Sequence, residues 1–94
     1  MIVAFDVDLT LITANDKINY RVMDLLRWFL DNHDRVIVWS GGGIEWAQRW
    51  VRHLGLEGKV EVAAKTKENA ELLGVDIAID DEFVTLGKVN IKTF

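Results

Sequence analysis

The chain has 94 residues, half of them hydrophobic, and its 11 basic and 15 acidic side chains give a formal net charge of −4. This length predicts one domain, residues 1–94. The apolar content is enough for a hydrophobic core. The negative net charge disfavours non-specific nucleic-acid binding unless the surface carries a local basic patch. Cysteine is absent from the sequence, which excludes disulfides and thiolate chemistry.

The first half of the chain alternates apolar runs with helical periodicity. Residues 2–5 predict a buried strand. Apolar residues then recur with the spacing of a helix, at Val22, Leu25, Leu26, Phe29 and Leu30. Residues 36–39 predict a second strand, and a second helical stripe closes at Gly55. Its members are Ile44, Ala47, Trp50, Val51 and Leu54.

The second half repeats this alternation in shorter elements. Residues 60–63 predict a strand, 68–73 a short helix stopped at Gly74, and 77–79 a further strand. The tail, 83–94, predicts a turn and a final strand. Alternating strands and helices of this kind predict a single α/β domain, Rossmann-like, with a parallel sheet flanked by helices.

Polar residues follow the predicted strands at or just beyond the point where each one ends. They are Asp6 and Asp8, then Ser40, then Lys65, and finally the pair Asp80–Asp81. Ligands of open α/β sheets bind in a crevice outside the carboxyl ends of the strands. We therefore expect these side chains, far apart in the sequence, to meet at one edge of the sheet.

The four aspartates of this group, Asp6, Asp8, Asp80 and Asp81, predict a metal site. Two like charges about 4 Å apart repel by about 4 kcal/mol at an effective dielectric constant near 20, so the cluster needs protons or a cation. Carboxylates without nearby His or Cys suit Mg²⁺ or Ca²⁺, and room for water and phosphate favours Mg²⁺. A lone Asp after a strand is usually a turn or capping residue, but two acidic pairs favour a metal.

A serine followed by three glycines leads into the second predicted helix. Glycines allow close backbone approach and a helix N-terminus offers free N–H groups, so Ser40, Gly41 and Gly42 are candidate phosphate ligands. Such a run is more often a plain loop, but its position at a strand end favours phosphate binding. Lys65 or Lys67 would supply a cation near the phosphate, and Lys65 is the better placed because it comes sooner after the strand.

These residues resemble the motifs of the haloacid dehalogenase superfamily. The segment Asp6-Val7-Asp8-Leu9-Thr10 resembles its Asp-x-Asp-x-Thr motif. The other three motifs are matched, in the family's order and over nearly the whole chain, by Ser40, Lys65 and the Asp80–Asp81 pair. The resemblance implies Mg²⁺-dependent phosphoryl transfer through an aspartyl-phosphate.

The resemblance also implies a role for each residue. Asp6 would attack phosphorus, and Asp8 would protonate the leaving group and then deprotonate the attacking water. Thr10 would shape the turn after the first strand and, with Ser40, belong to the phosphate site. Lys65 would hold both Asp6 and the phosphate.

The implied metal ligands come from both acidic pairs. Mg²⁺ would bind the Asp6 carboxylate, the Asp8 backbone carbonyl and one aspartate of the second pair. Asp81 is favoured as the direct ligand and Asp80 as its support, with the choice left open.

Two features depart from the family pattern. Thr66 stands where relatives often have proline, which keeps Lys67 as an alternative to Lys65. The sequence also has no insertion long enough for a cap domain, so we expect a capless member with an open crevice.

We therefore expect a phosphohydrolase acting on phosphomonoesters, small or macromolecular, including nucleotides and nucleic-acid ends. The alternatives are a phosphotransferase on the same scaffold and a catalytically idle metal-binding or interaction module. Trp46, Arg49 and Arg52 would contact a large substrate, unless a second subunit of a homo-oligomer covers the crevice or these residues are plain core and surface. The sequence has no signal peptide or membrane-length apolar stretch, so we expect a cytoplasmic protein.

Overall fold

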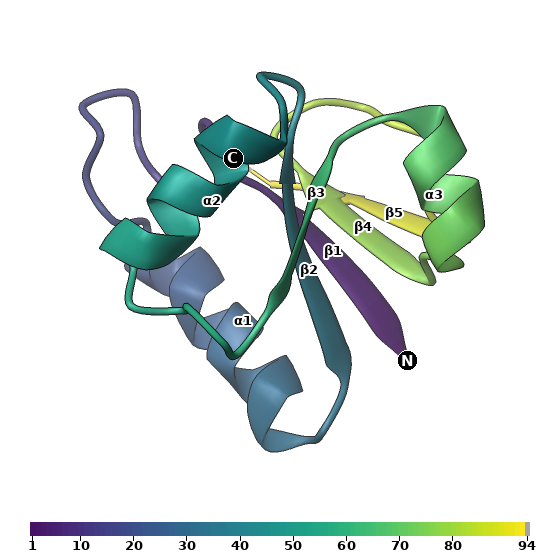
Figure 1. Cartoon of the computed structure of the whole chain (residues 1–94), viewed down its shortest axis with the longest axis horizontal. Coiled ribbons are helices and arrows are strands. Elements are labelled where there is room, and N and C mark those ends of the chain that lie inside the picture. Colours follow the sequence, from purple (N-terminus) through teal and green to yellow (C-terminus); the bar gives the residue numbers. More distant parts are fainter. Residues whose placement is uncertain (94) are drawn as a thin grey trace.

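Five parallel strands form the centre of the protein in the computed structural model, which describes residues 1–93 (Figure 1). The strands are β1 (Ile2–Asp6), β2 (Arg35–Ser40), β3 (Glu61–Ala64), β4 (Ile77–Asp80) and β5 (Val89–Lys92). The helices are α1 (Tyr20–Asp31), α2 (Ile44–His53) and α3 (Lys67–Leu73). The predicted Rossmann-like α/β class is confirmed, and no part of residues 1–93 forms a cap domain.

The strand order β3-β2-β1-β4-β5 puts β1 at the centre of the sheet. The chain builds outward from β1 to β3, and α3 then carries it back to β4 on the other side of β1. Residues Val3, Ala4 and Phe5 of this central strand have no exposed surface. Burial on both faces explains why the strand reads as a continuous apolar run rather than an alternating one.

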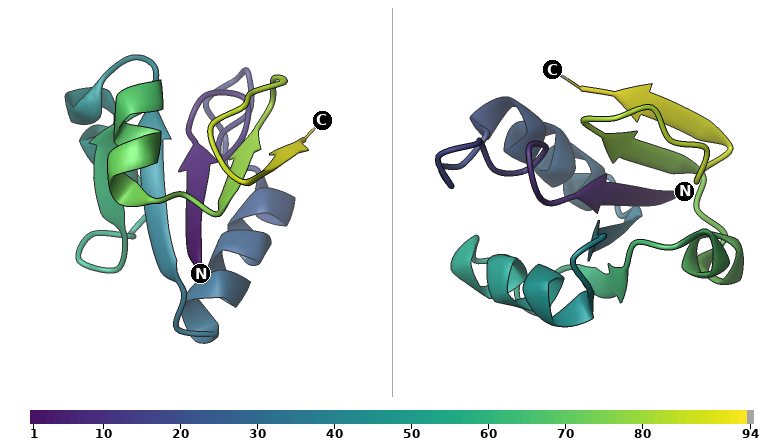
Figure 2. Two further views of the ribbon diagram at one scale, coloured as in Figure 1. Left: turned by 90° about the vertical axis from the view of Figure 1, so that its right-hand side faces the viewer. Right: turned by 90° about the horizontal axis from the view of Figure 1, so that it is seen from above.

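The helices divide between the two faces of the sheet. Apolar residues of α1 and α2, such as Leu26 and Val51, pack in one cluster with Phe5 and Val38. A second, smaller cluster on the other face includes Ala70 of α3. Figure 2 shows α3 on the opposite side of the strands from α1. The central strands are therefore covered on both faces, and polar residues lie at the amino and carboxyl ends of the strands.

The final strand pairs in parallel with β4 without an intervening helix. Residues 81–88 make this crossover, and Val84 and Leu86 within it pack against the smaller core cluster. Gly87 allows the crossover because a Cβ at this position would lie 2.8 Å from the backbone nitrogen of Ala78. The predicted turn and final strand are confirmed, with the strand ending at Lys92, and Phe94 lies outside the described residues.

Candidate active site

The register of the sheet brings the predicted residues to one edge. Asp6, Ser40 and Asp80 are each the last residue of a strand, and Lys65 follows the last residue of β3. Phe5 is opposite Ile79, so Asp6 and Asp80 end neighbouring strands at the same level. The carboxyl ends of parallel strands share one edge, and the apolar runs that form these strands therefore determine where the polar side chains meet.

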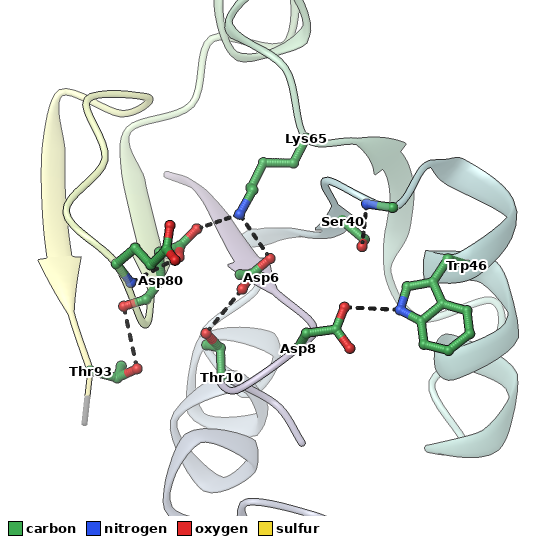
Figure 3. Close-up of polar contacts among 10 residues, drawn as sticks. Asp6, Asp8, Thr10, Ser40, Trp46, Lys65, Asp80 and Thr93 are labelled. Atoms are coloured by element: carbon green, nitrogen blue, oxygen red, sulfur yellow. Dashed lines mark hydrogen bonds and ion pairs between the residues drawn. The ribbon is translucent and has the colours of Figure 1, made fainter. Parts of the chain in front are cut away.

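Lys65 connects the two central carboxylates. Its Nζ lies 3.1 Å from Oδ1 of Asp6 and 3.0 Å from Oδ2 of Asp80 (Figure 3). Burial lowers the pKa of Lys65, but the hydrogen bonds and negative charges of the two aspartates outweigh this and raise it. Lys67 instead begins α3 and is exposed, while Thr66 caps that helix by accepting a hydrogen bond from Asn69 N. Of the two candidate lysines, Lys65 is the one in the site.

Asp6 is almost completely buried, with 4% of its surface exposed. Burial and the negative charge of Asp80 raise the pKa of Asp6 to about 7, against the opposing effect of Lys65. The hydroxyl of Thr10 donates to Oδ2 of Asp6 over 3.3 Å and is itself fully buried. Thr10, expected at the phosphate, instead supports Asp6 from inside the fold.

Three carboxylates lie close enough to share one cation. Single oxygens of Asp6, Asp80 and Asp81 all lie within 4.8 Å of one another. Both oxygens of Asp80 already accept hydrogen bonds, one from Lys65 and one from Glu82 N, and 1% of the residue is exposed. Asp81 is only half-buried. An all-carboxylate donor set fits a hard divalent cation such as Mg²⁺ or Ca²⁺, with Asp81 the more accessible ligand of the pair.

Asp8 lies apart from these three carboxylates and faces α2. Its side chain is exposed, and its Oδ2 accepts a 2.9 Å hydrogen bond from Nε1 of Trp46. Figure 3 shows the Asp8 carboxylate between Asp6 and the indole of Trp46. The sequence predicts Trp46 as a contact to a large substrate or as a plain core residue, and it does not indicate this bond. The feature of the sequence that could have indicated this bond is a tryptophan in the first turn of the helix that follows Ser40.

The Ser40 loop combines a buried hydroxyl with an uncapped helix start. Ser40 Oγ accepts a 3.0 Å hydrogen bond from Gly42 N, which leaves its O–H free to donate elsewhere. A Cβ on Gly42 would lie 3.3 Å from Ser40 Oγ and 3.4 Å from Trp46 Cδ1, so a larger residue would crowd this turn. A Cβ on Gly41 would make only an ordinary van der Waals contact, with Lys65 Cε 3.7 Å away. No side chain caps the N-terminus of α2, which suits an anion there.

The end of the chain also supports the site. The backbone N–H and hydroxyl of Thr93 both donate to the carbonyl oxygen of Asp80, over 2.7 and 3.3 Å. Asp81 and Thr93 line a hollow of about 430 Å³ together with Leu9 and Asn19. Nothing in the sequence around Thr93 indicated this contact, because it depends on how the crossover of residues 81–88 brings β5 alongside β4.

Comparisons with family models, with curated proteins and with solved structures found no significant match. Within residues 1–93, no helix has both the length and the apolar character needed to span a bilayer.

Proposed function

We propose that the protein is a Mg²⁺-dependent phosphohydrolase that cleaves phosphomonoesters through a phosphorylated Asp6. The observation that supports this most is the bridge from Lys65 to Asp6 and Asp80, beside the three-carboxylate group at the carboxyl edge of the sheet. The order of these residues in the chain, which resembles the haloacid dehalogenase motifs, supports the same reaction class.

The chemistry divides between Asp6 and Asp8. A carboxylate oxygen of Asp6 attacks phosphorus, the bond from phosphorus to the ester oxygen breaks, and Asp8 gives its proton to the departing oxygen. Asp8 then removes a proton from water, the water oxygen attacks phosphorus, and the Asp6–phosphorus bond breaks to release phosphate. Asp8 suits both proton transfers because it is exposed and lies apart from the buried cluster.

The charge of the cluster supports a divalent cation. Three carboxylates face one ammonium group, which leaves an excess of negative charge at a largely buried position. When bound, Mg²⁺ would offset this charge and that of a phosphate group. Asp6 and Asp81 would hold it directly, and Asp80 would keep Lys65 in place.

The phosphate itself would lie between the cluster and α2. The free O–H of Ser40 and the uncapped first-turn N–H groups of α2 can donate to phosphate oxygens, and Lys65 can stabilise the charge that develops on them. The fold places these donors at one edge of the sheet before a substrate binds, as electrostatic stabilisation of a transition state requires.

The test measures inorganic phosphate released from a panel of phosphomonoesters in Mg²⁺ and in EDTA. We expect turnover that requires Mg²⁺. Turnover unaffected by EDTA would contradict the metal role. Appearance of a phosphorylated alcohol in place of free phosphate would identify a phosphotransferase, and no turnover with retained Mg²⁺ binding would identify an idle module.

A further inference from the structure

A hollow of about 360 Å³ lies on the outer side of α2, next to the candidate site. It is lined by Trp46, Arg49, Trp50, Arg52 and His53. Its volume is within the range of small-ligand sites. Trp46 and Trp50 are partly exposed, and the other three side chains are exposed.

Aromatic rings line this hollow in succession. The ring centroids of Trp46 and Trp50 are 6.3 Å apart, and those of Trp50 and His53 are 5.2 Å apart, both edge-to-face. The guanidinium carbon of Arg49 lies 5.7 Å from the Trp46 ring centroid. Aromatic rings combined with arginines are the side chains on which nucleobases stack.

The hollow is also a local concentration of positive charge in an acidic protein. Arg49 and Arg52 both line it, although the formal charge of the chain is −4. Arg52 lies 3.6 Å from Glu57, but both side chains are exposed, and such pairs are weak enough for a phosphate to compete. The arginines therefore complement an anionic ligand that carries an aromatic group.

Trp46 connects the hollow to the reacting groups. It lines the hollow and donates through Nε1 to Asp8 over 2.9 Å. Under the proposed function, on which this inference rests, Asp8 protonates the leaving group. A leaving group within reach of Asp8 therefore also lies beside Trp46 and can extend onto α2.

We propose that this hollow binds the nucleobase of a nucleotide substrate, while the phosphate to be removed lies at Asp6. Arg49 stabilises the stacked base, and Arg52 binds a further phosphate where one is present. A free mononucleotide and the end of a single-stranded oligonucleotide share this chemistry.

The indole N–H signals of the tryptophans in ¹H–¹⁵N NMR spectra provide the test. AMP and ribose 5-phosphate, which lacks only the base, are titrated separately into the ¹⁵N-labelled Asp6→Asn protein with Mg²⁺, in which we expect no turnover. We expect AMP to bind about 10-fold more tightly, the size of one base-stacking contact. It should shift the signals of Trp46 and Trp50, while Trp39, fully buried, and Trp28, exposed on α1, stay in place. Equal affinities, or shifts confined to Trp28, would overturn the proposal.

Matched arginine variants separate the hollow from general charge effects. Arg49→Ala should remove most of the preference for AMP over ribose 5-phosphate, whereas Arg27→Ala on α1 should leave it unchanged. The same loss in both variants would overturn the proposal. This preference for AMP is measured without turnover, so it can fail while phosphate release by the wild type succeeds, and the reverse.

The two sources of the base are distinguished with a 5′-phosphorylated tetrathymidylate and TMP. Binding of the oligomer at least about 10-fold more tightly assigns the hollow to a strand end, and equal binding assigns it to a free nucleotide. Either result supports base recognition at α2, and no binding of both overturns it.

Discussion

Acidic side chains are paired differently at the amino and carboxyl ends of the strands. At the amino end, Arg35 binds Glu61 through two contacts of 2.8 and 2.9 Å, and both side chains are exposed. Asp76 accepts a hydrogen bond from Ile2 N over 2.7 Å and lies 3.4 Å from Lys88. Each of these acidic groups has a donor or cation of its own.

At the carboxyl end, three carboxylates lie together, and two of them share one lysine. Asp6 and Asp80 are buried there, and Lys65 is the cation that contacts both. Exposed balanced pairs contribute little to stability, whereas a buried group with excess negative charge is costly unless a ligand offsets it. The contacts at the amino end serve the fold, and we propose that the carboxyl end binds a cation and an anion.

Removing the proposed nucleophile should produce the largest effect. Asp6→Asn keeps the shape of the side chain but lacks the attacking oxygen, so hydrolysis of p-nitrophenyl phosphate should fall below detection. Glu61→Gln at the amino end is the control and should retain wild-type turnover. Near-normal turnover by Asp6→Asn would contradict the covalent mechanism.

Asp8→Asn should reduce turnover at least about 10²-fold, the lower end for general acid–base catalysis. p-Nitrophenolate departs without needing a proton, so with this ester the second step should slow most, and phosphorylated Asp6 should accumulate. Peptide mass mapping after acid quenching locates the phosphoryl group. A slow variant whose phosphoryl group lies on any residue other than Asp6 would refute the assignment.

Removing one cation from each end of the sheet should affect the stability of the protein to different degrees. Lys65→Met leaves the buried aspartates without a cation, and in EDTA it should lower the free energy of unfolding by about 2 kcal/mol, less than for a fully buried pair because Lys65 is partly exposed. Arg35→Met removes only exposed contacts and should change little. Urea unfolding of both variants measures the difference, and equal losses would remove the contrast between the ends.

The smallest effect is expected at Asp76. The hydrogen bond from Ile2 N, aided by Lys88, holds the pKa of Asp76 below its ordinary value of 3.8. A carboxyl group with a lowered pKa stabilises the fold above its ordinary pKa, and this stability is lost as the pH falls below it. Asp76→Asn should therefore lower the Tm by a few degrees at most at pH 7, and the difference should shrink below about pH 4. A difference that persists at low pH would indicate a loss of hydrogen bonding instead of charge.

The sequence predicted the strands and the edge where they end, because buried parallel strands read as continuous apolar runs. Asp6, Ser40 and Asp80 could be placed at that edge because each ends such a run. The choice of Lys65 over Lys67 depended on where β3 ends, one residue later than predicted, and on Thr66 acting as a helix cap.

The contacts that depend on loop geometry could not be predicted. The carbonyl of Val7 accepts N–H groups from Thr10, Leu11 and Ile12, which turns the chain under the sheet edge. Thr10 is buried by this turn, and no periodicity in the sequence specifies it. The bond between Trp46 and Asp8 similarly joins the first turn of α2 to the loop after β1.

Thermal unfolding with and without Mg²⁺ tests the central claim that the carboxyl end binds a divalent cation. At 100 times its dissociation constant, Mg²⁺ should stabilise the wild type by roughly 2.7 kcal/mol relative to EDTA. Asp81→Asn should lose most of this gain, and Asp76→Asn, at the other end of the sheet, should keep it. An unchanged wild-type midpoint, or the same gain in both variants, would contradict a shared carboxylate site at Asp6, Asp80 and Asp81.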